Sequence, residues 1–316
     1  MSTAIHWFRR DLRITDNTAL AAAVAAHDHV VPVYIVSEWQ TEHRWCGAPR
    51  QAFLCGCLAS LAKNLEAKGG RLIIRRGRAD AVLAELAQQT GADAIYFNRD
   101  PDPFGRAMEQ RLEKIARDLG VRLHAHQDIA LHERDELLTG SGTPFKVFTP
   151  YARAWLKLGK TAPGRSLSRI STPPRIASEP LPTLHTWKLS SDATIIEPGE
   201  AAARQRLGRF LDGPIFDYAN RRDLPAEDGT LAPFAGSPSR HPLHPRSLRE
   251  VRRGGREGPR HAASGRGDIH QRTHLARILS AGALALARSA RPGVAGALPA
   301  LAMARSLAPG SQGRRP

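Results

Sequence analysis

Residues 30–36 read Val-Val-Pro-Val-Tyr-Ile-Val, a short run of β-branched and aromatic side chains that is typical of a β-strand. Similar runs recur through the first 125 residues, separated by stretches with apolar side chains at helical spacing. The predicted strands are 4–8, 30–36, 71–74, 94–98 and 121–124. The predicted helices are 18–26, 50–67, 79–90 and 104–119. This alternation predicts a five-stranded, parallel, doubly wound α/β domain of Rossmann-like type.

The ends of the predicted strands indicate where a ligand would bind. In a doubly wound sheet, ligands bind outside the carboxyl ends of the strands, at the point where the strand order reverses. The sequence therefore points to residues 7–13, 36–39 and 98–102. No G-x-G-x-x-G or Walker glycine pattern follows the first strand, which argues against an ordinary dinucleotide or P-loop site.

Two different compositions are joined in this chain of 316 residues, whose net charge is +16. Residues 231–316 hold 15 Arg, no Lys and 3 acidic residues, so they carry +12, which leaves +4 for residues 1–230. All five Trp and all four Tyr also precede Thr230. The excess charge that would suggest nucleic-acid binding therefore lies mostly in the last 86 residues.

The middle of the chain reads as a connection between domains. From residue 132 to 198 the strand–helix alternation stops and Pro, Ser, Thr and Lys accumulate. Helical spacing returns at 200–211, where a second, helical domain is expected to begin. The predicted organisation is an α/β domain at 1–131, a linker at 132–198, the start of the helical domain at 199–230 and an aberrant, disordered Arg-rich tail at 231–316.

The remaining sequence features exclude several classes of protein. No apolar run is long enough to cross a bilayer, and the N-terminus does not read as a signal peptide, so we expect a cytoplasmic protein and no membrane partner. Cys46, Cys55 and Cys57 lack a second metal-spaced pair, which supports neither a disulfide framework nor a metal site. We expect buried free thiols on a helix, and a monomeric chain.

One motif carries a family resemblance. The stretch His6-Trp7-Phe8-Arg9-Arg10-Asp11-Leu12-Arg13-Ile14-Thr15-Asp16-Asn17 resembles the N-terminal signature W-F-R-x-D-L-R-x-x-D-N of the DNA photolyase and cryptochrome family. The likeness extends over residues 4–230 and includes Asn98-Arg99-Asp100 and Pro150-Tyr151. It implies an α/β domain for a light-harvesting antenna chromophore, a linker, and the entry to an all-helical domain that binds FAD.

The resemblance implies an antenna site formed by Phe8, Arg10, Asp100 and Asp102. Arginines at a strand end can hold an anionic cofactor tail, or can join the sheet end together by charge-assisted hydrogen bonds. The two aspartates can accept hydrogen bonds from a deazaflavin or pterin ring, or can simply begin the next helix. Gly105 stands where folate-binding members carry a glutamate, which favours a deazaflavin or flavin over folate.

A second family motif, Y-x-x-x-R-D-x-P-x-x-x-G-T-S-x-L-S-P, is matched only at its beginning. Tyr218 and Thr230 correspond to residues that hold the FAD phosphates, and Arg222 to one that approaches DNA. After Thr230 the chain continues with Leu231-Ala232-Pro233-Phe234, so the hydroxyl groups that would complete the phosphate site are absent. The resemblance therefore implies an incomplete FAD site, and no catalytic residue is assigned.

The break in this motif coincides with the change in composition, which suggests a shifted reading frame. Synonymous codons for residues 231–234, read one base later, encode Ser-Arg-Leu-Ser, which restores the motif. Permitted codons for residues 269–290 in the same frame encode a second family helix, which faces the flipped pyrimidine dimer. The rival interpretation is a genuine basic tail that binds nucleic acid through its phosphates.

The resemblance thus implies a deoxyribodipyrimidine photolyase-like protein, a lyase that uses light and FAD to repair cyclobutane pyrimidine dimers in damaged DNA. We expect this chain to be a truncated, inactive form of such an enzyme. Two alternatives stay open: a cryptochrome-type blue-light sensor, and a non-catalytic basic DNA-binding protein.

Overall fold

The structure is a computed structural model, and it describes residues 1–37, 47–100, 102–128, 132, 136–159, 164 and 167–212. Among these residues the chain forms two compact units. The first unit holds the described residues of 1–128 and 164–203, and the second holds those of 132–159 and 204–212. Residues 213–316, including the whole predicted Arg-rich tail, lie outside the described residues.

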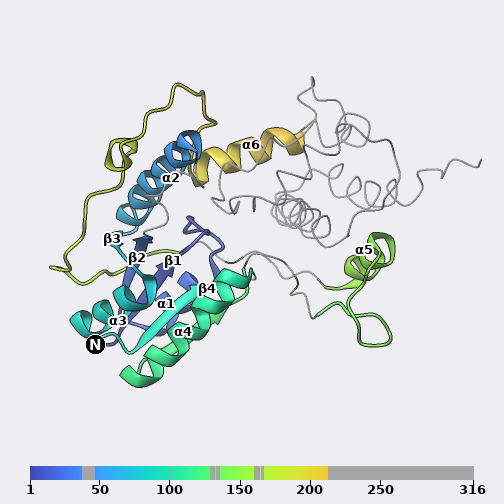
Figure 1. The fold of residues 1–316 in the computed structure, drawn as a ribbon, viewed down its shortest axis with the longest axis horizontal. Helices are drawn as coiled ribbons and strands as arrows, with labels where there is room; N and C mark the ends of the chain where they lie inside the picture. Colours follow the sequence, from blue (N-terminus) through green and yellow to red (C-terminus); the bar gives the residue numbers. More distant parts are fainter. Residues whose placement is uncertain are drawn as a thin grey trace, which may run out of the picture. The chain divides into compact units, whose positions relative to one another are not determined.

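The first unit contains a single parallel sheet with crossover helices (Figure 1). Its strands and helices, in chain order, are β1 (Thr3–Phe8), α1 (Thr18–Ala26), β2 (His29–Val36), α2 (Ala48–Glu66), β3 (Ile73–Arg76), α3 (Ala79–Thr90), β4 (Ala94–Asn98), α4 (Pro103–Leu119) and β5 (Arg122–His126). The strand order is β3-β2-β1-β4-β5, with every neighbouring pair parallel. The predicted five-stranded α/β fold is therefore confirmed.

Alternation of side chains along the strands builds two cores. On one face, Ala4 and Phe8 of β1 pack with the apolar sides of α1 and α2. On the other, Ile5 and Trp7 pack with α3 and α4. The sheet is buried on both faces, as expected for a doubly wound fold.

The ends of two helices and the start of one strand have clear local causes. Gly91 and Gly120 end α3 and α4 with φ of +63° and +68°, a left-handed conformation that glycine adopts without strain. Strand β3 begins two residues later than predicted. The reason is that the backbone N–H of Arg71 donates to the Thr172 hydroxyl at 3.1 Å, whereas pairing with β2 starts at Ile73.

Residues 167–199, the covering segment, lie along β3 and α2. The Glu179 N–H donates to the carbonyl of Ile74 at 3.0 Å, and the Ile74 N–H donates to the Ser178 hydroxyl at 2.9 Å. Trp187, in the short helix η3 (Leu184–Trp187), is 3% exposed and packs in the core beside α2. Part of the predicted linker is thus packed on the α/β domain, and it supplies hydrogen bonds to the outer edge of β3.

The second unit includes α5 (Phe148–Lys157), which the sequence did not predict, and most of α6 (Glu200–Asp212), which it did. Within this unit the buried Trp155 side chain meets the ring of His132 edge-on, with centroids 5.9 Å apart. No helix in the described ranges is long and apolar enough to span a membrane.

Candidate functional site

The loops after β1 and β4 meet where the strand order reverses, and they bring three predicted site residues together. Arg10 Nε lies 2.9 Å from Asp100 Oδ2, and an Arg10 Nη also pairs with Asp102. Asp102 is at the same time the N-cap of α4, where its carboxylate accepts the N–H of Gly105 at 2.6 Å. Arg10, Asp100 and Asp102 therefore form one cluster, in which Asp102 also begins a helix.

Arg9 binds on the other side of Asp100 through a residue that the sequence did not single out. Its Nη1 donates to Glu109 Oε1 at 2.6 Å, and the same carboxylate oxygen accepts the N–H of Asp100 at 2.9 Å. The Arg9 guanidinium also lies 4.8 Å from the centroid of the Trp7 ring. Glu109 lies on α4 one turn beyond Gly105, so helical spacing was the only signal that would have found it.

Asp11, Asn17 and Asn98 form a buried network between β1, α1 and β4. The Asn17 side-chain amide donates to Asp11 at 2.9 Å, and the Asn98 amide donates to both Asp11 and Asn17. Asn17 also caps α1 by accepting the N–H of Leu20, while Asn98 accepts the N–H of Ala19. These motif residues are hydrogen-bonded within the protein, so they join the sheet end to the first helix.

Arg13 closes the same end of the sheet on the β5 side. It donates to Asp128 Oδ1 at 2.7 Å and to the carbonyl of Asp16 at 2.6 Å. The Thr18 hydroxyl binds the same Asp128 oxygen at 3.2 Å. Arg9 and Arg13 both pair with buried or half-buried acceptors. They therefore match the interpretation in which the motif arginines join the sheet end together by charge-assisted hydrogen bonds.

The cluster differs from the network in its exposure. The side chains of Arg10 and Asp102 are 24% and 17% exposed, and the neighbouring Phe104 is 57% exposed. Asp100 is buried, and this burial raises its pKa to about 6 even though Arg10 and Arg9 favour the charged carboxylate. Phe8, in contrast, is fully buried in the core with α1 and α2. The partly exposed side chains of the cluster are therefore those of Arg10 and Asp102.

Gly105 leaves no space for a side chain. A Cβ at this position would lie 2.6 Å from the Cβ of Asp100 and 2.7 Å from its carbonyl oxygen. Any larger residue would push the first turn of α4 away from the loop after β4. The close contact of helix and loop here depends on glycine.

The other predicted binding residues cannot be placed. Tyr218, Arg222 and Thr230 lie outside the described residues, as do residues 38 and 39 after β2. Among the described residues no group of His, Cys, Asp and Glu is arranged to hold a metal ion. Cys55 and Cys57 are free thiols on α2, but only Cys57 is buried as predicted, and burial raises its pKa to about 11, whereas Cys46 lies outside the described residues.

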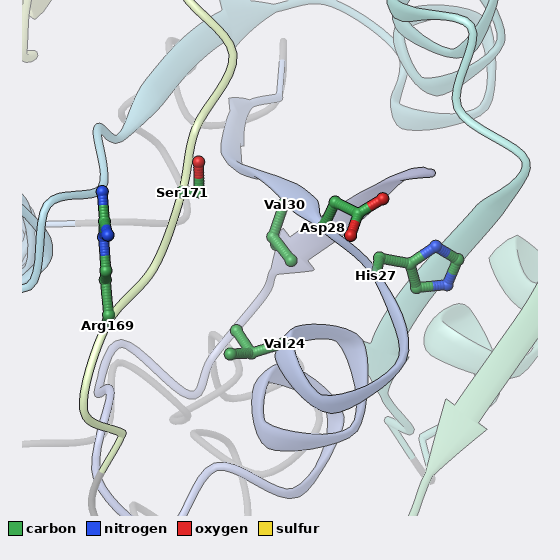
Figure 2. A pocket seen from close by; sticks show the side chains of 6 residues that line it. All are labelled: Val24, His27, Asp28, Val30, Arg169 and Ser171. Carbon is green, nitrogen blue, oxygen red and sulfur yellow. The ribbon is translucent and has the colours of Figure 1, made fainter. Parts of the chain in front are cut away.

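A cavity of about 340 Å³ lies at the opposite end of the sheet, where β2 begins (Figure 2). Its lining residues are Val24, His27, Asp28, Val30, Arg169 and Ser171. Figure 2 shows the His27 ring pointing away from Arg169 and Ser171, so the polar groups do not converge on one point. The cavity lacks the convergent polar groups of a ligand site.

Comparison with known proteins agrees with the fold and the motif. A family model described as DNA photolyase matches residues 4–173. A deoxyribodipyrimidine photo-lyase from Synechococcus sp. PCC 6301 is 34% identical over 236 residues, which cover 72% of this chain and 49% of that protein. An uncharacterized 31.6 kDa protein from Synechococcus sp. PCC 6716 is 34% identical over 241 residues, covering 73% of this chain and 83% of that protein.

A solved structure is also similar. The bacterial class III photolyase from Agrobacterium tumefaciens superposes with a TM-score of 0.67 and 30% identity, covering 90% of this chain and 58% of that chain. The chain therefore belongs to the DNA photolyase and cryptochrome family. It spans about half the length of the curated photo-lyase that it matches.

Proposed function

We propose that the α/β unit is the antenna domain of a deoxyribodipyrimidine photolyase, with a flavin or deazaflavin site at the carboxyl ends of β1 and β4. The observation that carries this proposal is the cluster of Arg10, Asp100 and Asp102 at the point where the strand order reverses, in a chain of the photolyase family. When bound there, such a chromophore would supply light absorption.

The residues of the cluster fit a chromophore with an anionic tail and a planar ring. Arg10 is a partly exposed cation, and Phe104, in the first turn of α4 after Asp102, is an exposed aromatic side chain. Asp102 is held by Arg10 and by the N–H of Gly105, so its carboxylate has a fixed position for accepting ring N–H groups. Phe8, which the resemblance places in the site, is buried in the core with α1 and α2.

Gly105 supports the preference for a flavin or deazaflavin over folate. The glutamate that the resemblance gives to folate-binding members does not fit here, because even a Cβ would overlap Asp100. The described loop accommodates only glycine in this conformation of α4.

The chromophore site is tested by expressing the full chain with a flavin or deazaflavin supply and measuring the pigment retained after gel filtration. Arg10→Gln should release the pigment because it removes the accessible cation. Arg122→Gln is the matched control, since this arginine lies in β5 and pairs with Asp93 on the surface. Equal pigment in wild type and Arg10→Gln would remove Arg10 from the site, and retained folate would reject the flavin assignment.

For the parent enzyme we propose light-driven, FAD-dependent repair of cyclobutane pyrimidine dimers in DNA. The likeness of this chain to the photolyase family ends at Thr230. It leaves an incomplete FAD site at Tyr218 and Thr230 and a DNA contact at Arg222. The match to the photo-lyase covers 72% of this chain, which leaves more than a quarter of the chain outside the likeness. We therefore propose that the chain is a truncated, inactive form whose residues 231–316 are read out of frame.

Sequencing the gene across the Thr230 codon tests the altered frame. An alternative frame that encodes Ser-Arg-Leu-Ser supports it, and the absence of such a frame makes the tail genuine and favours the basic DNA-binding protein. Repair of dimer-containing DNA by the frame-restored protein under blue light would separate a photolyase from a light sensor of cryptochrome type. Cytoplasmic location and a monomeric state stay predictions.

A further inference from the structure

Residues 13–18, here called the junction loop, form the second half of the signature motif and contact the chain where it passes between the two units. Among the described residues the chain passes after Asp128, before Gly164 and after Ala203. These three places are far apart in sequence, and the residues named here all belong to the first unit. The junction loop is therefore a candidate for a common anchor of the chain.

The junction loop holds the first two of these places by hydrogen bonds. Arg13 Nη2 and the Thr18 hydroxyl donate to the same oxygen of Asp128, at 2.7 and 3.2 Å. The backbone N–H of Gly164 donates to Asp16 Oδ1 at 2.5 Å. A Cβ at Gly164 would lie 3.3 Å from that carboxylate oxygen. Glycine therefore permits a close approach of the chain to the junction loop.

The third place is the start of α6. Glu200, the first residue of this helix, accepts the backbone N–H of Ile14 through Oε2 at 3.0 Å. The preceding Gly199 has φ of +106°, and a Cβ there would overlap the Ser60 hydroxyl of α2. Helix α6 therefore begins in close contact with both the junction loop and α2.

The backbone of the junction loop is held in an unusual conformation at Asp16. Its φ of +53° lies in the left-handed region, which costs free energy for a residue with a side chain and persists only where the surroundings hold it. The Asp16 carbonyl accepts from Arg13 Nη2 at 2.6 Å, while its carboxylate accepts the Gly164 N–H. Ile14 lies between Arg13 and Asp16 in the chain, so the group that binds Glu200 is fixed together with them.

We propose that residues 13–18 act as one conformational junction, which couples the three places where the chain passes between the units. Loss of one contact frees the backbone of the junction loop and weakens the other contacts, so the three places open and close together. Asp16 and Glu200 are the positioning residues of this device, because each accepts a backbone N–H from a distant part of the sequence. The junction uses only contacts within the first unit and does not depend on a chromophore.

Hydrogen–deuterium exchange of the full chain, measured by mass spectrometry, tests the junction at places remote from each substitution. Asp16→Gly removes the acceptor of the Gly164 N–H and leaves the left-handed backbone without strain. It should raise the exchange rate about 10-fold in the peptide that contains Gly164 and also in the first turns of α6, at 200–206. Lys188→Gly is the matched control, since Lys188 also has φ of +53° and is exposed after η3.

Glu200→Ala should give the reciprocal result. It removes the acceptor of the Ile14 N–H, so exchange should rise about 10-fold at residues 12–18 and also at Gly164. Glu200→Gln keeps a side-chain carbonyl oxygen as acceptor and should restore the protection. Glu113→Ala, on the exposed side of α4, is the control for the loss of a helix carboxylate.

Unchanged exchange, or faster exchange confined to the substituted contact, would overturn the junction, because the contacts would then be independent of one another. The amides of β1 and β4 are the internal reference for global unfolding. If they also exchange faster in both variants, Thr18→Val decides, since it replaces only the hydroxyl that binds Asp128. With this variant, faster exchange at Gly164 and at 200–206 supports the junction, and an effect limited to residues 122–128 rejects it.

Discussion

Two polar regions of the same α/β domain handle buried polar groups in opposite ways. At the carboxyl ends of β1 and β4, Asp11, Asn17 and Asn98 satisfy one another and the start of α1 through hydrogen bonds. Under α1, His6, His27 and His124 each leave at least one buried ring nitrogen without a hydrogen-bond partner. The first region gains stability and order from its hydrogen bonds, whereas in the second region burial lowers the pKa of His6 and of His124.

The hydrogen-bonded network should give the largest effect on stability. Asp11→Ala removes the shared acceptor of the Arg9 N–H and of the Asn17 and Asn98 amides. Leaving these buried donors unsatisfied should lower the free energy of unfolding by about 4 kcal/mol. Urea denaturation at pH 7 measures the change, with Asp118→Ala on the exposed side of α4 as the control. A loss comparable to that of the control would mean that water replaces Asp11 at little cost.

His6 should give the next largest effect on the free energy of unfolding. This effect is visible only when the pH is changed. Burial lowers the pKa of His6 to about 4, below its ordinary value of 6.5. The unfolded chain therefore takes up a proton first as the pH falls, so stability is lost between pH 6.5 and 4, by about 3 kcal/mol. Above pH 6.5 the imidazole is neutral in both states and contributes no slope.

The variant His6→Leu should remove this part of the pH dependence. Denaturation midpoints of wild type and variant, measured at pH 7, 6, 5 and 4, isolate it, because other groups titrate alike in both proteins. Parallel stability curves across this range would show that His6 is solvated or paired in solution, and the contrast between the two regions would then weaken.

A smaller change is expected where the Arg10 cluster touches α4. Alanine within a helix usually stabilises relative to glycine, but Gly105→Ala places a Cβ 2.6 Å from Asp100. The overlap should lower stability by about 2 kcal/mol. Gly140→Ala is the control, since nothing lies within 4 Å of its Cβ position. A stabilised Gly105→Ala protein would contradict the close contact of helix and loop.

The sequence predicted the fold well because each element had its own local signal. The strands and helices of the α/β unit follow from β-branched runs and helical spacing, and the strand ends pointed to residues 7–13 and 98–102, while the choice of Arg10, Asp100 and Asp102 came from the family resemblance. Pairings over long sequence separations had no such signal. Neither the link between Arg9 and Glu109 nor that between Arg13 and Asp128 is visible before β1, β4 and β5 are placed side by side.

Two further features of the α/β domain were not visible in the sequence. Phe8 precedes the motif arginines, so it was grouped with them, but alternation along β1 turns its side chain into the core. The contacts among the rings of His27, Tyr96 and His124 could not be predicted, because these residues lie far apart in sequence. A single histidine on a strand carries little information. Only the register that sets Tyr96 beside His124 joins two of them.

The smallest effect is expected for Arg122 and Asp93, two exposed charges that lie close to the buried His27 ring. Arg122 pairs with Asp93 at 2.9 Å, with 60% and 50% of the two side chains exposed. Exposed pairs gain little, because water and salt screen them and both side chains lose freedom, so Arg122→Gln should lower stability by about 0.5 kcal/mol. The loss should disappear in high salt, which screens exposed charges but hardly affects the Asp11 network. Urea denaturation at low and high salt measures both. If Arg122→Gln instead destabilised the protein as much as Asp11→Ala, the exposed pair would be as important for stability as the buried network. Arg122 would then be needed to hold the Asp93 carboxylate beside the buried His27 ring.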